Sequence, residues 1–229
     1  MTEDEKNRRL IAFLEQYATE HKRSFMDRVL QQRTRHVTVV MEDIYQSQNT
    51  SAVIRTCECL GLQEVHIVEN YSKYGTNKKV LKGSQYWIDL VRHKSRSADN
   101  AVACFRQLKE QGYRILVTDP SPDGVSIHDV DVVTRLALVM GNEQRGISDQ
   151  ALAMADQKVH IPMFGFTESL NISVSTAICL STLLAKLRQR NDVPWHLSDE
   201  EQIRIRLKWL RNVVKRSDLL EREFLKSIS

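Results

Sequence analysis

The middle of the chain alternates short, nearly continuous hydrophobic runs with longer amphipathic segments. The hydrophobic runs predict strands at 36–41, 64–68, 86–91, 113–118, 135–140 and 158–162. The amphipathic segments predict helices at 49–60, 97–111, 148–156 and 170–189. Strands that are apolar on both faces are typical of a parallel sheet covered by helices. The pattern therefore predicts an α/β fold with a mostly parallel sheet.

Both ends of the chain are predicted to be helical. Hydrophobic residues at helical spacing predict one helix over 3–32. Near the other end, Ser198 and Glu201 have the spacing of a capping box and precede an amphipathic stretch. We therefore divide the chain into an N-terminal helical extension, a central α/β domain and a C-terminal helical extension. Their expected bounds are 1–35, 36–190 and 191–229.

Composition narrows the class of protein. The 229 residues, 41% of them hydrophobic, are enough for one sizeable core with appendages. No apolar run reaches the roughly 18 residues that span a bilayer, and the charged N-terminus lacks a signal-peptide core. We therefore expect a cytoplasmic protein without a membrane partner. The four cysteines form no CxxC pair and no zinc-ligand spacing, so no metal site is predicted.

The net charge of +4 is weak evidence for a polyanionic partner, but its distribution is uneven. Residues 201–229 carry eight Lys or Arg and four Asp or Glu. A basic C-terminal segment fits a nucleic-acid partner, and it fits a solvated helix face equally well.

The loop 139–148 follows a predicted strand and precedes a predicted helix. Gly141 and Gly146 nearly match the glycine spacing of a P-loop, but Ile147 stands where the phosphate-binding lysine belongs. A nucleotide triphosphatase is therefore disfavoured, and without a GxGxxG motif so is a dinucleotide dehydrogenase. A loop at the carboxyl end of a strand is still where α/β sheets bind ligands, although a plain charged turn would look similar.

Two further segments carry candidate binding residues. In 46–56, Asn49 is expected to cap a helix that contains Arg55, a residue that could also extend to solvent. In 161–180, small polar residues occupy every second position before a hydrophobic run. Capping a helix would need only one of these residues, so the alternation indicates a surface at which a ligand can approach the backbone closely. A Ser–His hydrolase using His160 or His128 stays open, but no GxSxG elbow is present.

Three segments, taken together and in this order, resemble a known family. NTSAVIRT, LALVMGNEQRGIS and IPMFGFTESLNISVSTA resemble the three motifs of the SPOUT superfamily, and more narrowly the TrmH (SpoU) family of RNA 2′-O-ribose methyltransferases. The resemblance covers about 36–190. It implies an α/β sheet with a C-terminal trefoil knot, a pocket for S-adenosyl-L-methionine (AdoMet) within the knot, and a homodimer.

The resemblance also implies roles for single residues. The catalytic positions of the family correspond to Asn49, Arg55, Glu143, Ser169 and Asn171. The positions that contact AdoMet correspond to Thr118, Gly141, Ile161 and Leu170. Arg55 would polarise the ribose 2′-hydroxyl or stabilise the developing alkoxide, since a guanidinium with a pKa above ~12 is a poor base. Asn49 would hold Arg55 in place.

The terminal helices indicate which RNA is the substrate. They resemble those of family members that methylate guanosine 18 in the D-loop of tRNA, so tRNA is the expected substrate. Another tRNA position, ribosomal RNA, a non-catalytic RNA-binding protein and a nucleotide-binding switch are the alternatives. The cations expected to contact RNA are Lys22, Arg23, Arg33, Arg35, Lys73, Lys78, Lys79, Lys82, Arg204, Arg211 and Lys215.

Overall fold

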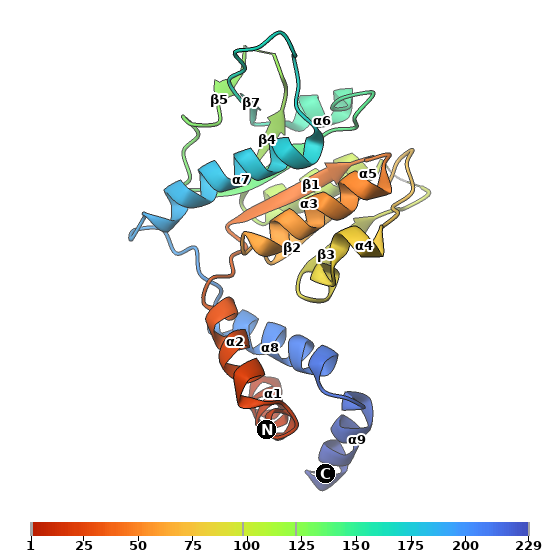
Figure 1. Cartoon of the computed structure of the whole chain (residues 1–229), viewed down its shortest axis with the longest axis vertical. Coiled ribbons are helices and arrows are strands. Elements are labelled where there is room, and N and C mark those ends of the chain that lie inside the picture. The colour runs from red at the N-terminus through yellow and green to blue at the C-terminus, as the bar shows by residue number, and fades with distance from the viewer. Residues whose placement is uncertain (1, 98, 122, 229) are drawn as a thin grey trace. The chain divides into compact units, whose positions relative to one another are not determined.

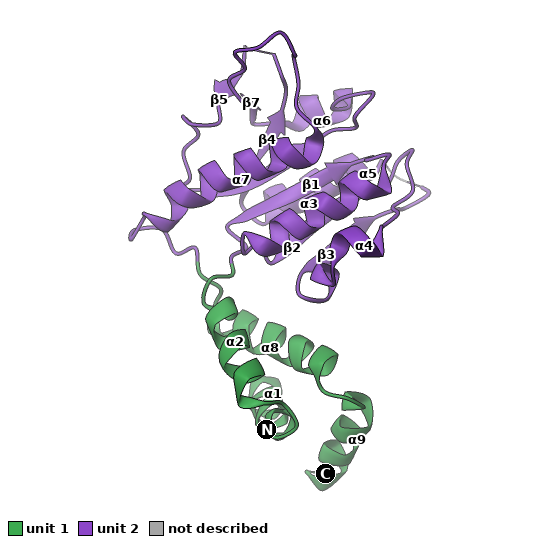
Figure 2. Ribbon diagram, in the orientation of Figure 1, with its two compact units in different colours: residues 1–33, 196–229 green, residues 34–195 purple. Residues whose placement is uncertain are grey.

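The computed structural model describes residues 2–97, 99–121 and 123–228, which form two compact units (Figure 2). The sheet unit comprises the described residues of 34–195. The helical unit comprises 2–33 together with 196–228, so the two ends of the chain fold with each other. In the part of the chain that the structure describes, no helix combines the length and the apolar character needed to cross a bilayer.

The sheet unit contains a seven-stranded sheet in which every pair of neighbours is parallel, in the order β3-β2-β1-β6-β4-β7-β5. The strands are β1 (Val37–Glu42), β2 (Glu64–Val68), β3 (Asp89–His93), β4 (Tyr113–Thr118), β5 (Val125–Ser126), β6 (Arg135–Met140) and β7 (Gln157–His160). The predicted α/β class and parallel sheet are confirmed. The predicted strand 86–91 begins three residues too early, because Gly83 at φ +87° leads into a 3-10 turn over Ser84–Tyr86. The two-residue strand β5 was missed.

Helices cover both faces of the sheet. They are α3 (Ser47–Cys59), α4 (Lys78–Leu81), α5 (Asn100–Glu110), α6 (Asp149–Met154) and α7 (Ile172–Arg188). Helices α3 and α7 pack in one hydrophobic core against alternate residues of the central strands, such as Val39 and Leu138. Helices α5 and α6 pack on the opposite side against Val40 and Val139. Figure 1 shows helices on both sides of the sheet, so alternate residues of the central strands are buried on opposite faces and these strands read as continuous hydrophobic runs.

The direction of chain progression reverses beside β1. Strands β2 and β3, which follow β1 in the sequence, lie on one side of it. Strand β6 is its neighbour on the other side, where Val39 of β1 pairs with Leu138 of β6. Because all strands are parallel, their carboxyl ends share one edge, and ligands of open α/β sheets bind where the strand order reverses. The fold therefore predicts a site over the carboxyl ends of β1, β6 and β4. The trefoil knot stays a prediction from the resemblance.

The helical unit contains α1 (Glu3–Glu15), α2 (Glu20–Leu30), α8 (Asp199–Val213) and α9 (Ser217–Ser227). The single helix predicted over 3–32 is wrong, because the Thr19 side chain accepts the Lys22 N–H and starts a second helix. The capping box of Ser198 and Glu201 is confirmed. The unit is therefore built around packed amphipathic helices, with Trp209 fully buried.

Candidate functional site

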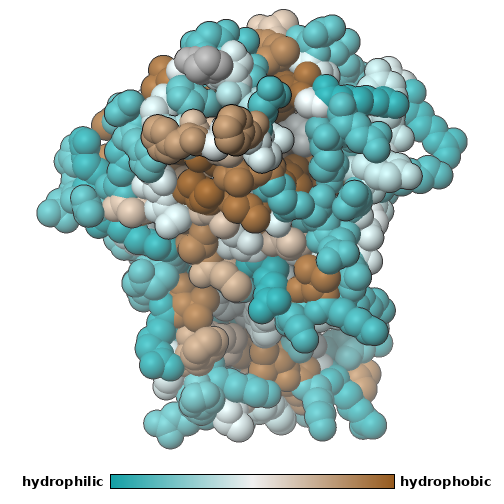
Figure 3. All heavy atoms as spheres, turned by 45° about the horizontal axis from the view of Figure 1, so that its top comes forward, coloured by the Kyte–Doolittle hydropathy of each residue, from teal (hydrophilic) through white to brown (hydrophobic). Residues whose placement is uncertain are grey.

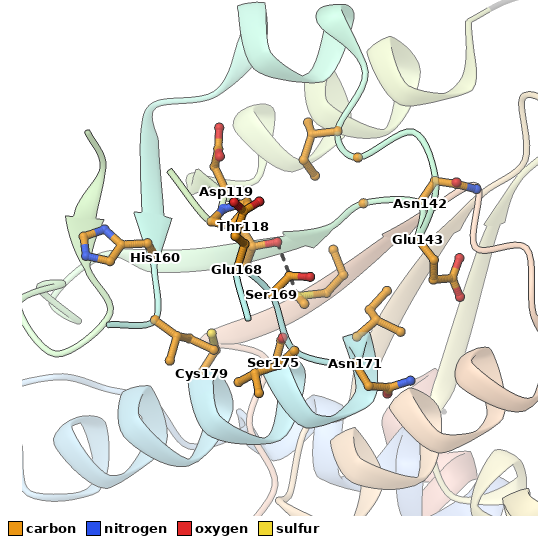
Figure 4. Close-up of a pocket in the computed structure, with 18 of the residues that line it drawn as sticks. Thr118, Asp119, Asn142, Glu143, His160, Glu168, Ser169, Asn171, Ser175 and Cys179 are labelled. Carbon is orange, nitrogen blue, oxygen red and sulfur yellow. Dashed lines mark hydrogen bonds between the residues drawn. The ribbon is translucent and has the colours of Figure 1, made fainter. Parts of the chain in front are cut away.

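A cavity of about 530 Å³ lies over the carboxyl ends of the central strands (Figure 4). Its walls come from the loops that follow β1, β4, β6 and β7 and from the first turns of α7. The volume falls in the range of small-molecule sites, roughly 300–1,000 Å³. The position is the one that the strand order predicts.

Eight of the nine candidate residues line this cavity. They are Asn49, Thr118, Gly141, Glu143, Ile161, Ser169, Leu170 and Asn171. Segments separated by more than 100 residues thus meet at one place. The ninth, Arg55, is not among the lining residues; it is exposed on α3, six residues beyond Asn49.

A directed chain of hydrogen bonds links the three motif segments. Asn49 Nδ2 donates to Glu143 Oε1 at 2.7 Å, and Asn171 Nδ2 donates to Asn49 Oδ1 at 3.2 Å. Asn171 Oδ1 in turn accepts the Ser173 N–H at 2.9 Å and caps α7. The Tyr45 N–H donates to the other oxygen of Glu143 at 3.2 Å. Each amide orientation follows from its neighbour, and the Glu143 carboxyl is the acceptor at the end of the chain.

The structure changes two expectations about Asn49. Gln46, not Asn49, is the N-cap of α3, and Asn49 lies inside the first turn with 8% exposure. Among the described residues, no hydrogen bond joins Asn49 to Arg55. The Asn49 amide is used to hold Glu143 and Asn171 instead, so it positions the cavity wall.

The loop after β6 is tightly folded. A Cβ on Gly141 would lie 2.6 Å from the carbonyl carbon of Gly146, which leaves no room for a side chain. Gly146 has φ +69°, and Asn142 Oδ1 accepts the N–H groups of Gln144 and Arg145 at 2.9 and 3.0 Å. The two glycines therefore let the backbone of this loop reach the cavity directly.

The two ends of the segment 161–170 line the cavity, through Ile161 and Met163 and through 168–170. Within the described part of the chain, no hydrogen bond ties any residue of this segment to another residue. Its N–H and C=O groups are therefore available to a ligand. Phe164 and Phe166 are 98% and 108% exposed, so the segment also presents an uncovered hydrophobic surface.

The cavity is negatively charged. The carboxylates of Asp119, Glu143 and Glu168 line it, and none of its described lining residues is Lys or Arg, while Lys158 Nζ lies 3.6 Å from the Asp119 carboxylate. Such a lining favours a cationic ligand and opposes a triphosphate, in agreement with the missing P-loop lysine. Thr118 Oγ1 donates to the Val139 carbonyl at 2.9 Å, which leaves its lone pairs to face the cavity.

The arrangement gives no support to a Ser–His hydrolase. His160 lines the cavity, but no hydrogen bond joins it to a serine among the described residues, and its Nδ1 is buried without a partner. His128 is not among the lining residues. A hydrolase would need its base within hydrogen-bond reach of the nucleophile.

Sequence reasoning missed Glu42, the last residue of β1, which is hydrogen-bonded to the end of the loop after β6. Glu42 is 2% exposed and accepts from the Ser148 N–H at 3.1 Å and from its hydroxyl at 2.5 Å. Burial raises the pKa of Glu42 above its usual value, against the bonds from Ser148, which lower it. The available signal was an acidic residue at the end of an otherwise apolar strand.

Two cations expected to contact RNA have partners within the protein instead. Arg33 is 1% exposed, with its guanidinium 5.4 Å from the Trp209 ring centroid. Arg35 pairs with Glu64 and, at 2.5 Å, with Asp89. Neither is therefore a surface contact for RNA. The remaining expected cations are exposed or partly exposed: Lys22, Arg23, Lys73, Lys78, Lys79, Lys82, Arg204, Arg211 and Lys215.

The structure brings together one group of metal-binding residue types that the sequence spacing did not reveal. The ligand atoms of His66, His93 and Cys104 all lie within 4.8 Å of one another. His66 Nδ1 and His93 Nε2 are 3.0 Å apart, which is the distance of a direct hydrogen bond. The two rings thus already satisfy each other without an ion.

Comparison with known proteins agrees with the site. Residues 36–181 match the SpoU rRNA Methylase family, so the chain belongs to this family, and the resemblance of its motifs is confirmed. The chain is 39% identical over 211 residues to a tRNA (guanosine(18)-2′-O)-methyltransferase of Borreliella burgdorferi, covering 92% of this chain and 94% of the relative. It is 36% identical to the Escherichia coli enzyme of the same name, covering 76% of this chain and 73% of the relative.

Solved structures show the same architecture. The TrmH/SpoU tRNA modifying enzyme of A. aeolicus superposes with a TM-score of 0.75 at 29% identity, covering 86% of this chain and 98% of that one. The SpoU methyltransferase AviRb of Streptomyces viridochromogenes, solved with AdoMet, superposes with a TM-score of 0.59 at 22% identity, over 72% of this chain and 65% of that one. At this identity the second likeness concerns the fold.

Proposed function

We propose that this protein transfers a methyl group from AdoMet to the ribose 2′-hydroxyl of guanosine 18 in the D-loop of tRNA. Membership of the SpoU family and the names of the relatives support the reaction and the substrate. The observation that carries the proposal is the cavity itself, where all three motif segments converge. A tRNA substrate would place the enzyme in the cytoplasm.

The cavity suits AdoMet in shape and charge. The unbonded backbone of 161–170 and the close approach at Gly141 offer N–H and C=O groups for an adenine and a ribose. Met140, Ile147 and Ile172 supply apolar walls. The three carboxylates favour a sulfonium and an ammonium, and they make the same cavity unsuitable for ATP.

AdoMet would supply an electrophilic methyl group to the ribose oxygen. The chain's own part is positioning: Asn49, held by Asn171, fixes the Glu143 carboxylate at the rim, and Ser169 offers a hydroxyl to the same cavity. Correct alignment alone can lower such a barrier by several kcal/mol. Arg55 would stabilise charge that develops on the 2′-oxygen, since its guanidinium stays protonated.

We further propose that the enzyme acts as a homodimer in which Arg55 serves the cavity of the partner subunit. Arg55 is exposed and lies outside its own cavity, so a second copy offers a direct way to bring it to a reacting ribose. Phe164, Phe166 and Val174 are uncovered beside the cavity, and Figure 3 shows hydrophobic side chains gathered on the forward face. Exposed apolar surface of this kind is typical of an interface between subunits.

The reaction is tested by transfer of labelled methyl from AdoMet to unmodified tRNA transcripts, with ribosomal RNA in parallel. One transcript carries 2′-deoxyguanosine at position 18. We expect labelling of tRNA that disappears with the deoxy substitution. Labelling of ribosomal RNA alone would keep the reaction and refute the substrate, and AdoMet binding without labelling of any RNA would refute the activity.

The subunit arrangement is tested by mixing two variants that are defective in different parts of the site, at an AdoMet concentration too low for Gly141→Ala to turn over. Arg55→Ala is expected to abolish turnover and to leave AdoMet affinity intact, whereas Gly141→Ala is expected to weaken AdoMet binding. A mixed dimer of the two would combine an intact cavity with an intact Arg55 from the other subunit. Recovery of activity on mixing supports the shared site, and no recovery despite proven subunit exchange contradicts it.

A further inference from the structure

We propose that Tyr45, Tyr71 and Arg145 form a stacking platform for unstacked bases of the RNA next to the target ribose. This rim platform rests on the proposed function and adds a binding surface to the same site. Tyr45 and Tyr71 are 69% and 75% exposed, which is unusual for side chains with so much apolar area. Arg145 is also exposed, and its guanidinium lies 5.1 Å from the Tyr71 ring centroid.

The platform adjoins the reactive end of the cavity. The Tyr45 N–H donates to Glu143 at 3.2 Å, and Arg145 lies two residues beyond Glu143 in the same turn. Glu143 lines the cavity together with Asn49. A ribose presented to a cofactor in this cavity must therefore bring its flanking nucleotides close to the platform.

Asp43 holds the three loops of the platform together. Its Oδ1 accepts the N–H groups of Asn70, Tyr71 and Ser72 at 2.8, 2.7 and 2.9 Å. Its carbonyl accepts Asn142 Nδ2 at 2.6 Å, and it adopts φ +51°, a left-handed conformation that few non-glycine residues tolerate. The loops after β1, β2 and β6 are thus fixed to one another, although the side chains that they present to solvent do not pack in a hydrophobic core.

The chemistry of the platform fits nucleic acid. Unstacked RNA bases bind on Tyr rings and on Arg guanidinium planes, and Arg145 adds a positive charge for a neighbouring phosphate. One face of Tyr71 is occupied by Arg145, and its exposure leaves surface for a base. The cavity beside it is negative, so the platform is where a polyanion can be held without entering the cofactor site.

The test compares Tyr71→Ala, Tyr71→Phe and Arg145→Ala with wild type, using unmodified tRNA transcript as the probe. A lost stacking contact, worth about 1–3 kcal/mol, corresponds to about a 10-fold rise in Kd and KM for tRNA in Tyr71→Ala. Tyr71→Phe keeps the ring and should bind like wild type. Arg145→Ala should lower the slope of log Kd against log salt by about 1, and Tyr71→Ala should leave that slope unchanged.

Tyr86→Ala is the matched control, because Tyr86 is 56% exposed but precedes β3, at the opposite edge of the sheet. It should bind tRNA as wild type does, and AdoMet affinity should stay within about twofold in every variant. Wild-type affinity of Tyr71→Ala for tRNA would overturn the proposal. So would a change in its sedimentation, since the surface would then belong to a second copy.

Failure of the proposed function is a separate outcome. If wild type binds tRNA but transfers no methyl, the proposed function fails, while the affinities of the variants still decide whether the platform binds RNA. If wild type binds no RNA, both are refuted.

Discussion

Two networks of polar side chains in the sheet unit differ in whether they leave hydrogen-bonding groups available to a ligand. The chain Glu143–Asn49–Asn171 stands at the carboxyl edge and borders a cavity. A second network, around Glu64 and His66, lies along β2 and β3, and none of its members lines that cavity. Both consist of short, well-oriented bonds, so hydrogen bonding alone does not separate a binding site from a structural one.

The second network is closed on itself. Arg35 pairs with Glu64 and Asp89, and His66 Nε2 lies 3.0 Å from Glu64 Oε1. Burial raises the pKa of Glu64, but the hydrogen bond from His66 and the charge of Arg35 outweigh burial, and its pKa lies below the usual value. His93 completes the network through His66. Each of these charged groups thus has a partner within the network, which is what a buried charge needs to be stable.

The first network leaves hydrogen-bonding groups available to a ligand. Glu143 is exposed and receives two donors from the described residues, fewer than its oxygens can accept. The adjoining segment 161–170 has free backbone groups. The difference indicates that a polar network marks a binding site when some of its hydrogen-bonding groups stay unsatisfied and face a cavity. It marks a structural element when its groups satisfy one another.

Among changes to these two networks and the cavity wall, the largest effect is expected from Asn49→Asp, which places a carboxylate against Glu143. Loss of a hydrogen bond to a charged group together with repulsion, about 3 kcal/mol, should lower kcat/KM by about 100-fold. As pH falls, a proton shared by the two carboxyls can restore the bond, so the variant should approach wild type in acid. Methyl-transfer rates across pH measure this, and a constant ratio of the two rates would contradict the bonding chain.

Gly141→Ala should weaken AdoMet binding next most strongly. The new Cβ would lie 2.6 Å from Gly146 and 2.8 Å from Ile147 Cδ1, and overpacking of about 1–3 kcal/mol corresponds to a loss of about 10- to 100-fold. Calorimetric titration with AdoMet measures it. Gly165→Ala, in the segment 161–170, is the control, because its Cβ would meet nothing within 4 Å. An equal loss in both variants would refute the steric argument.

A change in the closed network should alter stability and leave ligand affinity intact. Glu64→Gln removes the negative charge between Arg35 and His66, and a broken, mostly buried pair of this kind costs about 2 kcal/mol. Urea denaturation should show the lower free energy of unfolding. Reduced AdoMet affinity in the folded variant would mean that the two networks are coupled, against the separation described above.

The sequence predicted the sheet and the converging motifs but not the contacts between them. Continuous apolar runs such as 135–140 and 113–118 identified central strands, because burial on both faces leaves that pattern. The strand order and the bond from Asn49 to Glu143 join residues 94 positions apart, and no local pattern records such a pair. The break between α1 and α2 was missed because hydrophobic spacing continues across it, although α1 ends at Glu15 and the Thr19 hydroxyl caps the start of α2.

The smallest expected effect concerns His93 and the pH dependence of stability. Burial, followed by the charge of His66, lowers the pKa of His93 to about 4 in the folded protein, whereas an unfolded histidine titrates near ~6.5. A depressed pKa means that the unfolded state binds the proton first. The stability contributed by neutral His93 is therefore complete above about pH 6.5 and is lost progressively as pH falls toward 4.

His93→Gln should flatten this dependence by on the order of 1 kcal/mol, a value reduced for the partial exposure of the ring. Urea denaturation of wild type and variant at a series of pH values measures the difference between their slopes. His21→Gln, at an exposed position on α2, is the control and should follow wild type. Parallel curves for wild type and His93→Gln would show that His93 takes up its proton as easily in the folded chain as in the unfolded one. The second network would then be open to solvent, and the contrast with the cavity edge would rest on geometry alone.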